Sequence, residues 1–337
     1  MPILDQTNPK EVAAYQAFIE SSPYARATQD MAWARVKANW VPEYVYLTEN
    51  GGTCEEEPIT AALSMLGIRA VQNKTLLYAC RGPVADFYDV ETCCRLIEES
   101  RPLFEKHEAF VLRIDPEVPW DGELVEAYRR KGFTVRSRET GIHDFIQPRF
   151  DMILPIGGMT EEEVLNSVSS KCRYNIRLAH RKGVTTRWSR EAEDLAVYEL
   201  TKIMAERQGI TYRPISYFEN LLEAYPEVRI YLSSHEDEIL SAAIAFPYGE
   251  QMWYMYGASS NVKRNYMPNY DMQWEMIKWG IELGKTRYNL GGVYAFTPED
   301  GIFHFKNGFC QHVGPTEWIG ELDVVLDESA YQEYVSR

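Results

Sequence analysis

The chain has 337 residues, of which 45% are hydrophobic, 13% aromatic and 25% charged, and it carries a formal net charge of -15. This length predicts two domains, and the composition excludes a disordered or fibrous protein. So negative a charge also excludes a protein that coats nucleic acid without specificity, because neutralising phosphates requires an excess of Lys and Arg.

The N-terminal segment and the cysteines indicate a cytoplasmic protein. The first residues, MPILDQTNPKEV, contain no basic segment followed by an apolar run, and no stretch of the chain approaches about 18 consecutive apolar residues. The six cysteines include no C-x-x-C pair, so they predict neither a disulfide framework nor a zinc site. We expect a cytoplasmic monomer that does not insert stably into membranes and whose thiols are reduced.

Two parts of the sequence show the same order of predicted elements, which is strand, strand, helix, strand. The first set comprises 59–70, 75–84, 90–107 and 109–117, and the second comprises 239–249, 252–260, 271–284 and 287–294. β-forming residues predict the strands, and the period of Trp274, Ile277 and Ile281 before Gly284 predicts the last helix. This order resembles the core of the GNAT acyltransferase fold. We therefore expect an α/β (α+β) protein with two tandem GNAT-like domains, the first at 1–148 with 318–337 returning to it, and the second at 149–317.

A single long helix is predicted between the two sets. Thr160 and Glu163 have the spacing of a capping box at its start, and Gly183 marks its end. On this helix Arg173, Arg177 and Arg181 recur every four residues and form one basic stripe. Charge alone favours a solvated helix face that pairs with the acidic remainder of the chain. The absence of any acid among residues 171–190, which include seven basic ones, supports phosphate binding instead.

The segment before the last predicted helix argues against coenzyme A. In a GNAT acetyltransferase, a glycine-containing loop at this place binds the CoA pyrophosphate through backbone N–H groups. Residues 264–270 contain no glycine, and Pro268 has no N–H to donate. We therefore expect no cofactor and an acyl donor other than CoA. A CoA-dependent N-acyltransferase remains an alternative function, because it would share the fold.

Three local patterns have both a functional and a structural interpretation. GIELGKT (280–286) has three residues between its glycines where a Walker loop has four, and it lies at a helix end. His304, Cys310 and His312 are one ligand short of a metal site, so we expect no metal and no Cys/His nucleophile. Lys306 lies between two phenylalanines, where a lysine either covers apolar surface with its stem or acts in catalysis.

Several segments together resemble the FemABX family of peptidoglycan aminoacyltransferases. They are IQPRF (146–150), KCRYNIRLAHRKGV (171–184), ERQGITYRPISYF (206–218), WYMYGASS (253–260), YNLGGV (288–293) and DGIFHFKNGF (300–309), with RGPV (81–84) and RIDPEV (113–118) in the first half. The likeness covers nearly the whole chain in the family's own order. Some members carry an inserted helical arm. The chain has no room for one between the helix expected at 199–209 and the strand expected at 228–233, so it resembles the compact, arm-less FemX-like type.

The resemblance implies an enzyme that forms interpeptide bridges. Such an enzyme transfers an amino acid (Ala, Ser or Gly) from aminoacyl-tRNA to the side-chain amine of the peptidoglycan-precursor stem peptide, carried by UDP-MurNAc-pentapeptide or lipid II. Because the donor is an activated ester, alignment of the amine and stabilisation of the oxyanion suffice without a covalent intermediate. A noncatalytic nucleotide-sugar or RNA-binding module is a second alternative, which would need Arg213 and the basic stripe but not Lys306.

The resemblance also implies roles for single residues. Lys37 and Arg213 match positions that hold the diphosphate of the nucleotide precursor, and Phe305 with Lys306 matches the pair at the transfer site. The residues that match the lining of the acceptor groove are Thr211, Tyr217 and Tyr256, and Asp115 matches a position near the stem peptide. If the basic stripe binds phosphate, Arg173, Arg177 and Arg181 contribute to docking the tRNA. Asn289 departs from the pattern, because many relatives have an acid before the Gly-Gly pair, and a candidate base is thereby removed.

Overall fold

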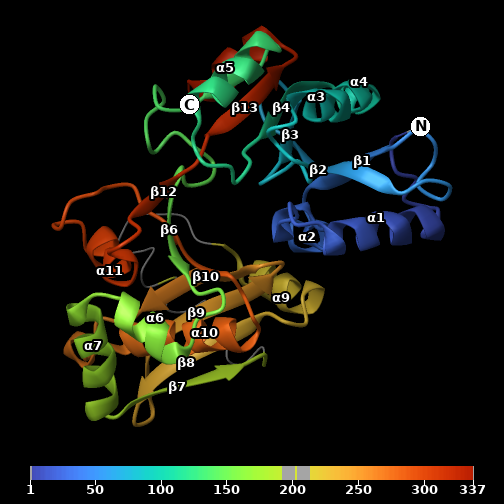
Figure 1. The fold of residues 1–337 in the computed structure, drawn as a ribbon. Helices are drawn as coiled ribbons and strands as arrows, with labels where there is room; N and C mark the ends of the chain where they lie inside the picture. The colour runs from blue at the N-terminus through green and yellow to red at the C-terminus, as the bar shows by residue number, and fades with distance from the viewer. Residues whose placement is uncertain (1, 192–201, 203–212, 337) are drawn as a thin grey trace. The chain divides into compact units, whose positions relative to one another are not determined.

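The computed structural model describes residues 2–191, 202 and 213–336, which form two compact units (Figure 1). Unit 1 comprises Met1–Arg149 and Glu317–Arg337, and unit 2 comprises Phe150–Thr316. The chain therefore leaves unit 1 once, forms unit 2, and returns.

Unit 1 contains a six-stranded sheet in the order β1-β2-β3-β4-β13-β5. The strands are β1 (Val41–Thr48), β2 (Ile59–Arg69), β3 (Thr75–Ala79), β4 (Ala109–Ile114), β5 (Thr134–Arg136) and β13 (Glu321–Val325). Only β3 and β4 pair in parallel. The helices are α1 (Pro9–Ser21), η1 (Ala27–Gln29), α2 (Trp33–Val36), α3 (Val90–Glu99), α4 (Arg101–Lys106), α5 (Gly122–Arg130) and α12 (Glu328–Val335).

The last strand of the chain, β13, completes the sheet of unit 1. It is drawn in red in Figure 1, beside the teal β4, with Asp323 opposite Arg113. The Arg113 guanidinium donates to both carboxylate oxygens of Asp323 at 2.7 Å, and both side chains are buried. A bidentate pair of this kind fixes the register of two strands that lie far apart in the sequence.

Unit 2 contains a seven-stranded sheet in the order β12-β6-β11-β10-β9-β8-β7. The strands are β6 (Phe150–Pro155), β7 (Val184–Ser189), β8 (Arg229–His235), β9 (Glu238–Tyr248), β10 (Gln251–Ser259), β11 (Arg287–Gly292) and β12 (Pro315–Glu317). The helices among its described residues are α6 (Glu161–Ser167), α7 (Ser170–Arg181), α9 (Ile215–Ala224), η3 (Arg264–Tyr266), α10 (Pro268–Glu282) and α11 (Gly301–Cys310). Strands β10 and β11 are parallel, as a crossover through α10 requires.

The predicted order of strand, strand, helix and strand is confirmed in both units. In unit 1 the helical part is divided at Ser100 into α3 and α4. In unit 2 the order is β9, β10, α10 and β11, and Gly284 follows α10 with a φ of +67°. The segment at 199–209 lies outside the described residues.

The prediction of one long helix at 160–183 is wrong. Its capping box at Thr160 is present, but α6 ends at Ser167, and Val168 and Ser169 adopt extended backbone. The Ser169 hydroxyl accepts the backbone N–H of Cys172 and so begins a new helix, α7. Serines compete in this way with continuous helix, because their side chains satisfy backbone groups at caps.

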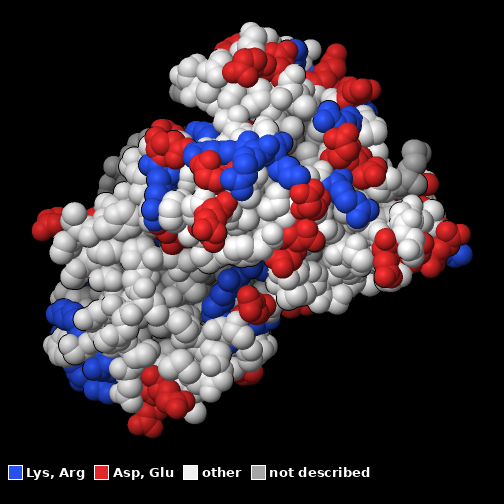
Figure 2. Space-filling view, turned by 45° about the horizontal axis from the view of Figure 1, so that its top comes forward, with Lys and Arg blue, Asp and Glu red and all other residues white. Residues whose placement is uncertain are grey.

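The surface drawn in Figure 2 shows Lys and Arg intermixed with Asp and Glu, so the net charge of -15 does not produce a uniformly acidic face there. Within the described ranges, no helix has both the length and the apolar character needed to cross a bilayer.

Candidate functional site

In unit 2, the parallel strands β10 and β11 stop pairing beside a Gly-Gly turn. Strand β10 pairs with β11 from Gln251 opposite Arg287 to Trp253 opposite Asn289. A bulge follows in β10 between Tyr254 and Tyr256. On β11, Gly291 has a φ of +80°, which side chains disfavour, and its N–H donates to the Asn289 side chain at 2.7 Å. Buried Asn289 therefore shapes the Gly-Gly turn.

Lys306 reaches this turn from α11. The helix begins at Asp300, whose carboxylate caps the N–H of Phe303. The Lys306 ammonium donates to the carbonyl oxygen of Gly292 at 2.8 Å. Its Nζ atom also lies 3.5 Å from where a Cβ on Gly291 would stand. The structure thus places a lysine cation beside the end of the β10–β11 pairing.

The charge of Lys306 is set by two opposing effects. Burial lowers the pKa of Lys306 to about 8, and the carboxylate of Asp151 acts in the opposite direction. Asp151 lies on β6, opposite Gly292 in the strand register, and is 3% exposed. Sequence reasoning missed Asp151. The signal was an acid that directly follows the IQPRF segment at the start of an otherwise apolar strand.

Phe305, which precedes Lys306 in α11, lies in an aromatic cluster. Its ring centroid is 4.9 Å from that of Tyr270 and 5.6 Å from that of Phe309. Tyr270 is on α10, so this cluster joins α10 to α11. The residue before Lys306 in α11 therefore packs into an aromatic cluster.

Two predicted groove residues, Tyr217 and Tyr256, and the predicted diphosphate residue Arg213 lie together near the start of α9. The Tyr256 hydroxyl donates to the Tyr217 hydroxyl at 3.1 Å, and the Arg213 guanidinium lies 5.4 Å from the Tyr217 ring centroid. Arg213 is exposed, whereas Tyr217 is buried. Thr211 lies outside the described residues.

Lys37 lies in unit 1, at the C-terminal end of the short helix α2. Its ammonium is 5.8 Å from the centroid of the Trp40 ring. The side chain is partly exposed.

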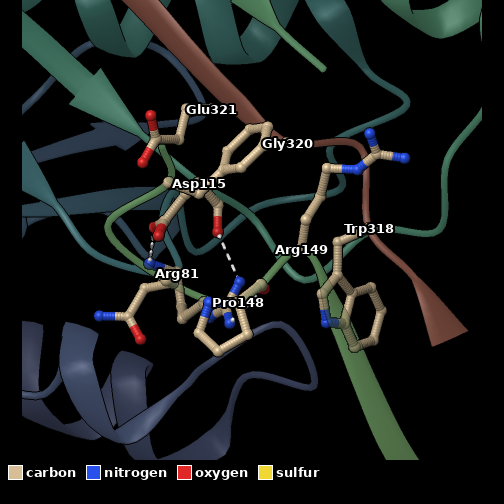
Figure 3. Close-up of a pocket in the computed structure, with 9 residues that line it drawn as sticks. Arg81, Asp115, Pro148, Arg149, Trp318, Gly320 and Glu321 are labelled. Atoms are coloured by element: carbon tan, nitrogen blue, oxygen red, sulfur yellow. Dashed lines mark hydrogen bonds between the residues drawn. The ribbon is translucent and has the colours of Figure 1, made fainter. Parts of the chain in front are cut away.

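Asp115 lies in a small pocket of unit 1 (Figure 3). The residues labelled around it are Arg81, Pro148, Arg149, Trp318, Gly320 and Glu321. One carboxylate oxygen accepts the Tyr78 hydroxyl and the other accepts the backbone N–H of Arg81, both at 2.6 Å. Asp115 is 2% exposed. Its carboxylate therefore fixes the RGPV segment, where Arg81 has a φ of +56°.

The basic stripe is divided by the structure. Arg173 donates to the carbonyl oxygens of Leu165, Asn166 and Val168, which are the last carbonyls of α6 and its cap. Arg177 and Arg181 are exposed on α7. Arg173 thus holds the α6–α7 corner, and the other two arginines face solvent.

In unit 2, residues 264–270 occupy the place where a GNAT enzyme binds pyrophosphate, and several of their backbone groups bond to one another. The N–H groups of Tyr266, Met267 and Tyr270 donate to carbonyls of the same turn. Asp271 is buried in the first turn of α10, where its carboxylate accepts the Thr186 hydroxyl. Three paired amides, together with a buried acid, disfavour a diphosphate here.

The described residues contain no cluster of His, Cys, Asp and Glu suited to a metal ion. His304 and His312 are exposed, whereas Cys310 is buried against Cys172.

Comparison with known proteins identifies close relatives. The model of the FemAB family matches residues 11–236 and 227–335. The UDP-N-acetylmuramoylpentapeptide-lysine N(6)-alanyltransferase of Weissella viridescens is 37% identical over 99% of both chains. The lipid II:glycine glycyltransferase of Staphylococcus epidermidis is 28% identical over 94% of this chain and 92% of the relative. That alignment spans 393 residues, more than the 337 of this chain, so the glycyltransferase carries insertions that this chain lacks.

Solved structures show the same relationship. A crystal structure of FemX superposes with a TM-score of 0.83 and 26% identity, covering 96% of this chain and 98% of that chain. A tandem GNAT protein from the clavulanic acid biosynthesis pathway superposes with a TM-score of 0.54 at 9% identity, covering 94% and 95%. The fold is therefore a tandem GNAT-like fold, with no inserted coiled-coil arm in the described residues.

Proposed function

The chain belongs to the FemAB family, and on that premise we propose that it adds an amino acid to the side-chain amine of a peptidoglycan-precursor stem peptide. The alanyltransferase of W. viridescens acts, by its name, on the lysine of the UDP-linked pentapeptide, and the similarity to it extends over both full chains. This supports UDP-MurNAc-pentapeptide as the acceptor. Lipid II, named for the glycyltransferase, is the other candidate.

The observation that carries the proposal is the place of Lys306. Attack of an amine on an aminoacyl ester puts negative charge on the former carbonyl oxygen, and a fixed cation in a water-poor site stabilises that charge. Lys306 is held by the Gly292 carbonyl, and its neighbour Phe305 packs against Tyr270 and Phe309. A noncatalytic binding module would not require this partly buried lysine beside the Gly-Gly turn.

We further propose that the donor is aminoacyl-tRNA. An RNA donor agrees with the exposed Arg177 and Arg181 on α7. The turn at 264–270 opposes CoA, since three of its amides already have partners and Pro268 has none to donate. No resident cofactor is then needed, because the ester brings its own activation.

For the acceptor, we propose that Lys37 and Arg213 bind the diphosphate. Both are partly or fully exposed cations, and a diphosphate needs such partners. Tyr217 and Tyr256 would orient the bound precursor through their paired hydroxyl groups.

The test is transfer from a radiolabelled pool of aminoacyl-tRNAs to UDP-MurNAc-pentapeptide and, separately, to lipid II. Mass spectrometry of the product identifies the amino acid, the acceptor and the amine modified. The Lys306→Met variant serves as the inactive control. Absence of product with both acceptors would refute the proposal, and thermal stabilisation by acetyl-CoA would favour a CoA-dependent N-acyltransferase.

A further inference from the structure

The outer face of α7 carries an exposed aromatic ring among cations. Lys171, Tyr174, Arg177 and Arg181 are all exposed, and their spacing puts them within one side of the helix. The opposite side, with Cys172, Ile176 and Ala179, is buried. In the part of the chain that the structure describes, no acidic side chain forms an ion pair with any of these three cations.

Tyr174 lies between two of the cations. Its ring centroid is 5.3 Å from the Lys171 ammonium and 5.5 Å from the Arg181 guanidinium. Both cations lie over the ring, and the side chain is still 49% exposed, so they leave about half of it open to solvent. An exposed ring flanked by cations is suited to a base that stacks on the ring while its neighbouring phosphates meet the cations.

Helix α7 packs directly on the helix that carries Lys306. The Ser169 N–H, at the cap of α7, donates to the Gly308 carbonyl of α11 at 2.9 Å. Cys172 and Ile176 of α7 share one apolar core with Phe309 and Cys310 of α11. Helix α7 is therefore the neighbour of α11, and its exposed outer face, which carries Tyr174, lies on the side away from this shared core. The nucleotides that precede a terminal ester at Lys306 would reach this face by passing over α7.

We propose that Tyr174, with Lys171 and Arg181, is a stacking site for an unpaired base in the single-stranded 3′ tail of the RNA donor. This inference rests on the proposed tRNA dependence and adds to it how the RNA is held. Arg177 contacts phosphate only, whereas Tyr174 discriminates an unpaired tail from a blunt duplex. The site does not read sequence, because every base presents a π-face.

The test uses two RNA hairpins with the same stem, one with an unpaired 3′ tail of about four nucleotides and one blunt-ended. Dissociation constants are measured at fixed low salt for wild type, Tyr174→Ala, Tyr174→Phe and Arg177→Gln. Loss of one base–aromatic stack weakens binding by roughly 5- to 150-fold. We expect this loss for Tyr174→Ala with the tailed hairpin only, and near-normal binding for Tyr174→Phe. Arg177→Gln should weaken both hairpins to a similar degree.

A fluorescent 2-aminopurine in the tail gives an independent readout. Its emission should be quenched by wild type and Tyr174→Phe but not by Tyr174→Ala. Equal binding of the tailed hairpin by wild type and Tyr174→Ala, equal weakening of both hairpins, or failure of wild type to bind the tailed hairpin would each overturn the inference. Transfer by wild type from aminoacyl-tRNA is measured in parallel. If transfer occurs and the Tyr174 effect is missing, only the stacking site fails, whereas absence of transfer refutes the proposed function itself.

Discussion

The ammonium of Lys306 lies 2.8 Å from the carbonyl oxygen of Gly292. This hydrogen bond connects α11 to the last residue of β11, the strand that precedes it. Lysine has three N–H donors, and the Gly292 carbonyl fixes the direction of one. The carbonyl therefore fixes the position of the cation, although the lysine stem is flexible. A cation that is already positioned does not have to be ordered when the reaction occurs.

Replacing Lys306 by Met should lower kcat by roughly 10²- to 10³-fold, by analogy with loss of one oxyanion donor. Binding of both substrates should remain nearly intact, since the charge arises only in the transition state. Lys285→Met is the matched control, because the Lys285 ammonium also donates to a backbone carbonyl, that of Gly249 at 2.6 Å. Single-turnover rates decide the question. A Lys306→Met rate within about threefold of wild type would show that the lysine only covers apolar surface with its stem.

Replacing Arg213 by Ala should weaken binding of the nucleotide precursor. A hydrogen bond to a charged group contributes about 1.5–3 kcal/mol, which corresponds to roughly 10- to 150-fold in affinity. The control is Arg264→Ala, another exposed arginine of unit 2. Calorimetric titration with UDP-MurNAc-pentapeptide measures both variants. Equal affinity of Arg213→Ala and wild type would remove Arg213 from the diphosphate site.

The two exposed arginines of α7 should determine the salt dependence of tRNA binding. Arg177→Gln and Arg181→Gln should each reduce the slope of log Kd against log salt by roughly one. Arg173→Gln should leave the slope unchanged and instead lower the stability of unit 2, because Arg173 holds the end of α6. Filter binding across a salt series checks the slopes. A flatter slope for Arg173→Gln than for the other two would reverse this assignment.

The sequence predicts the elements of each GNAT-like core because their signals are local. Strand β9 is a nearly continuous run of apolar residues, and α10 keeps the helical period of its apolar residues up to Gly284. β-forming residues and helical spacing therefore suffice to predict these elements. The break between α6 and α7 depends on whether Ser169 turns its hydroxyl to Cys172. A serine in a helical pattern does not reveal that choice, so the break was missed.

The sequence predicts which residues belong to the site, but it does not predict which residues contact them. Lys306 stands out in its segment, whereas its dependence on Asp151 arises from pairing between β6 and β11, some 140 residues apart in the chain. Arg173 and Arg177 look equivalent in a stripe of period four. Only the position of the α6 carbonyls separates them. Asp115 likewise looks like a ligand residue, and only the structure reveals that Tyr78 and Arg81 occupy its oxygens.

Breaking the ion pair between β4 and β13 should destabilise unit 1. Arg113→Met leaves the buried carboxylates of Asp323 and Glu321 without their shared cation, which costs about 3–5 kcal/mol. The exposed Arg101, which pairs with Glu98, is the control, and its Met variant should behave as wild type. Amide hydrogen exchange of the β4 and β13 peptides measures the local stability. Unchanged protection in Arg113→Met would show that the sheet does not depend on this pair.

The charge state of Lys306 should appear in the pH dependence of transfer. Burial lowers the pKa of Lys306 to about 8, so its ammonium form is lost as the pH rises through that value. The attacking amine also titrates, and it does so in both enzymes, so dividing the wild-type rate by the Lys306→Arg rate removes the contribution of the amine. The titration of Lys306 remains in the ratio, because the arginine guanidinium stays charged. This ratio should be constant below about pH 7 and fall about tenfold per unit well above pH 8.

Asp151→Asn identifies the cause of that pH dependence. The Asp151 carboxylate favours the charged form of Lys306, so removing it should move the bend in the rate ratio to lower pH and lower the rate at neutral pH. Unfolding does not produce this pattern. Between pH 8 and the ordinary lysine value of 10.5, the folded chain binds fewer protons at Lys306 than the unfolded chain, so this group's contribution to stability rises as its contribution to rate falls. A bend at the same pH in Asp151→Asn and wild type, measured by rapid-quench single turnovers, would exclude electrostatic control of Lys306 by Asp151.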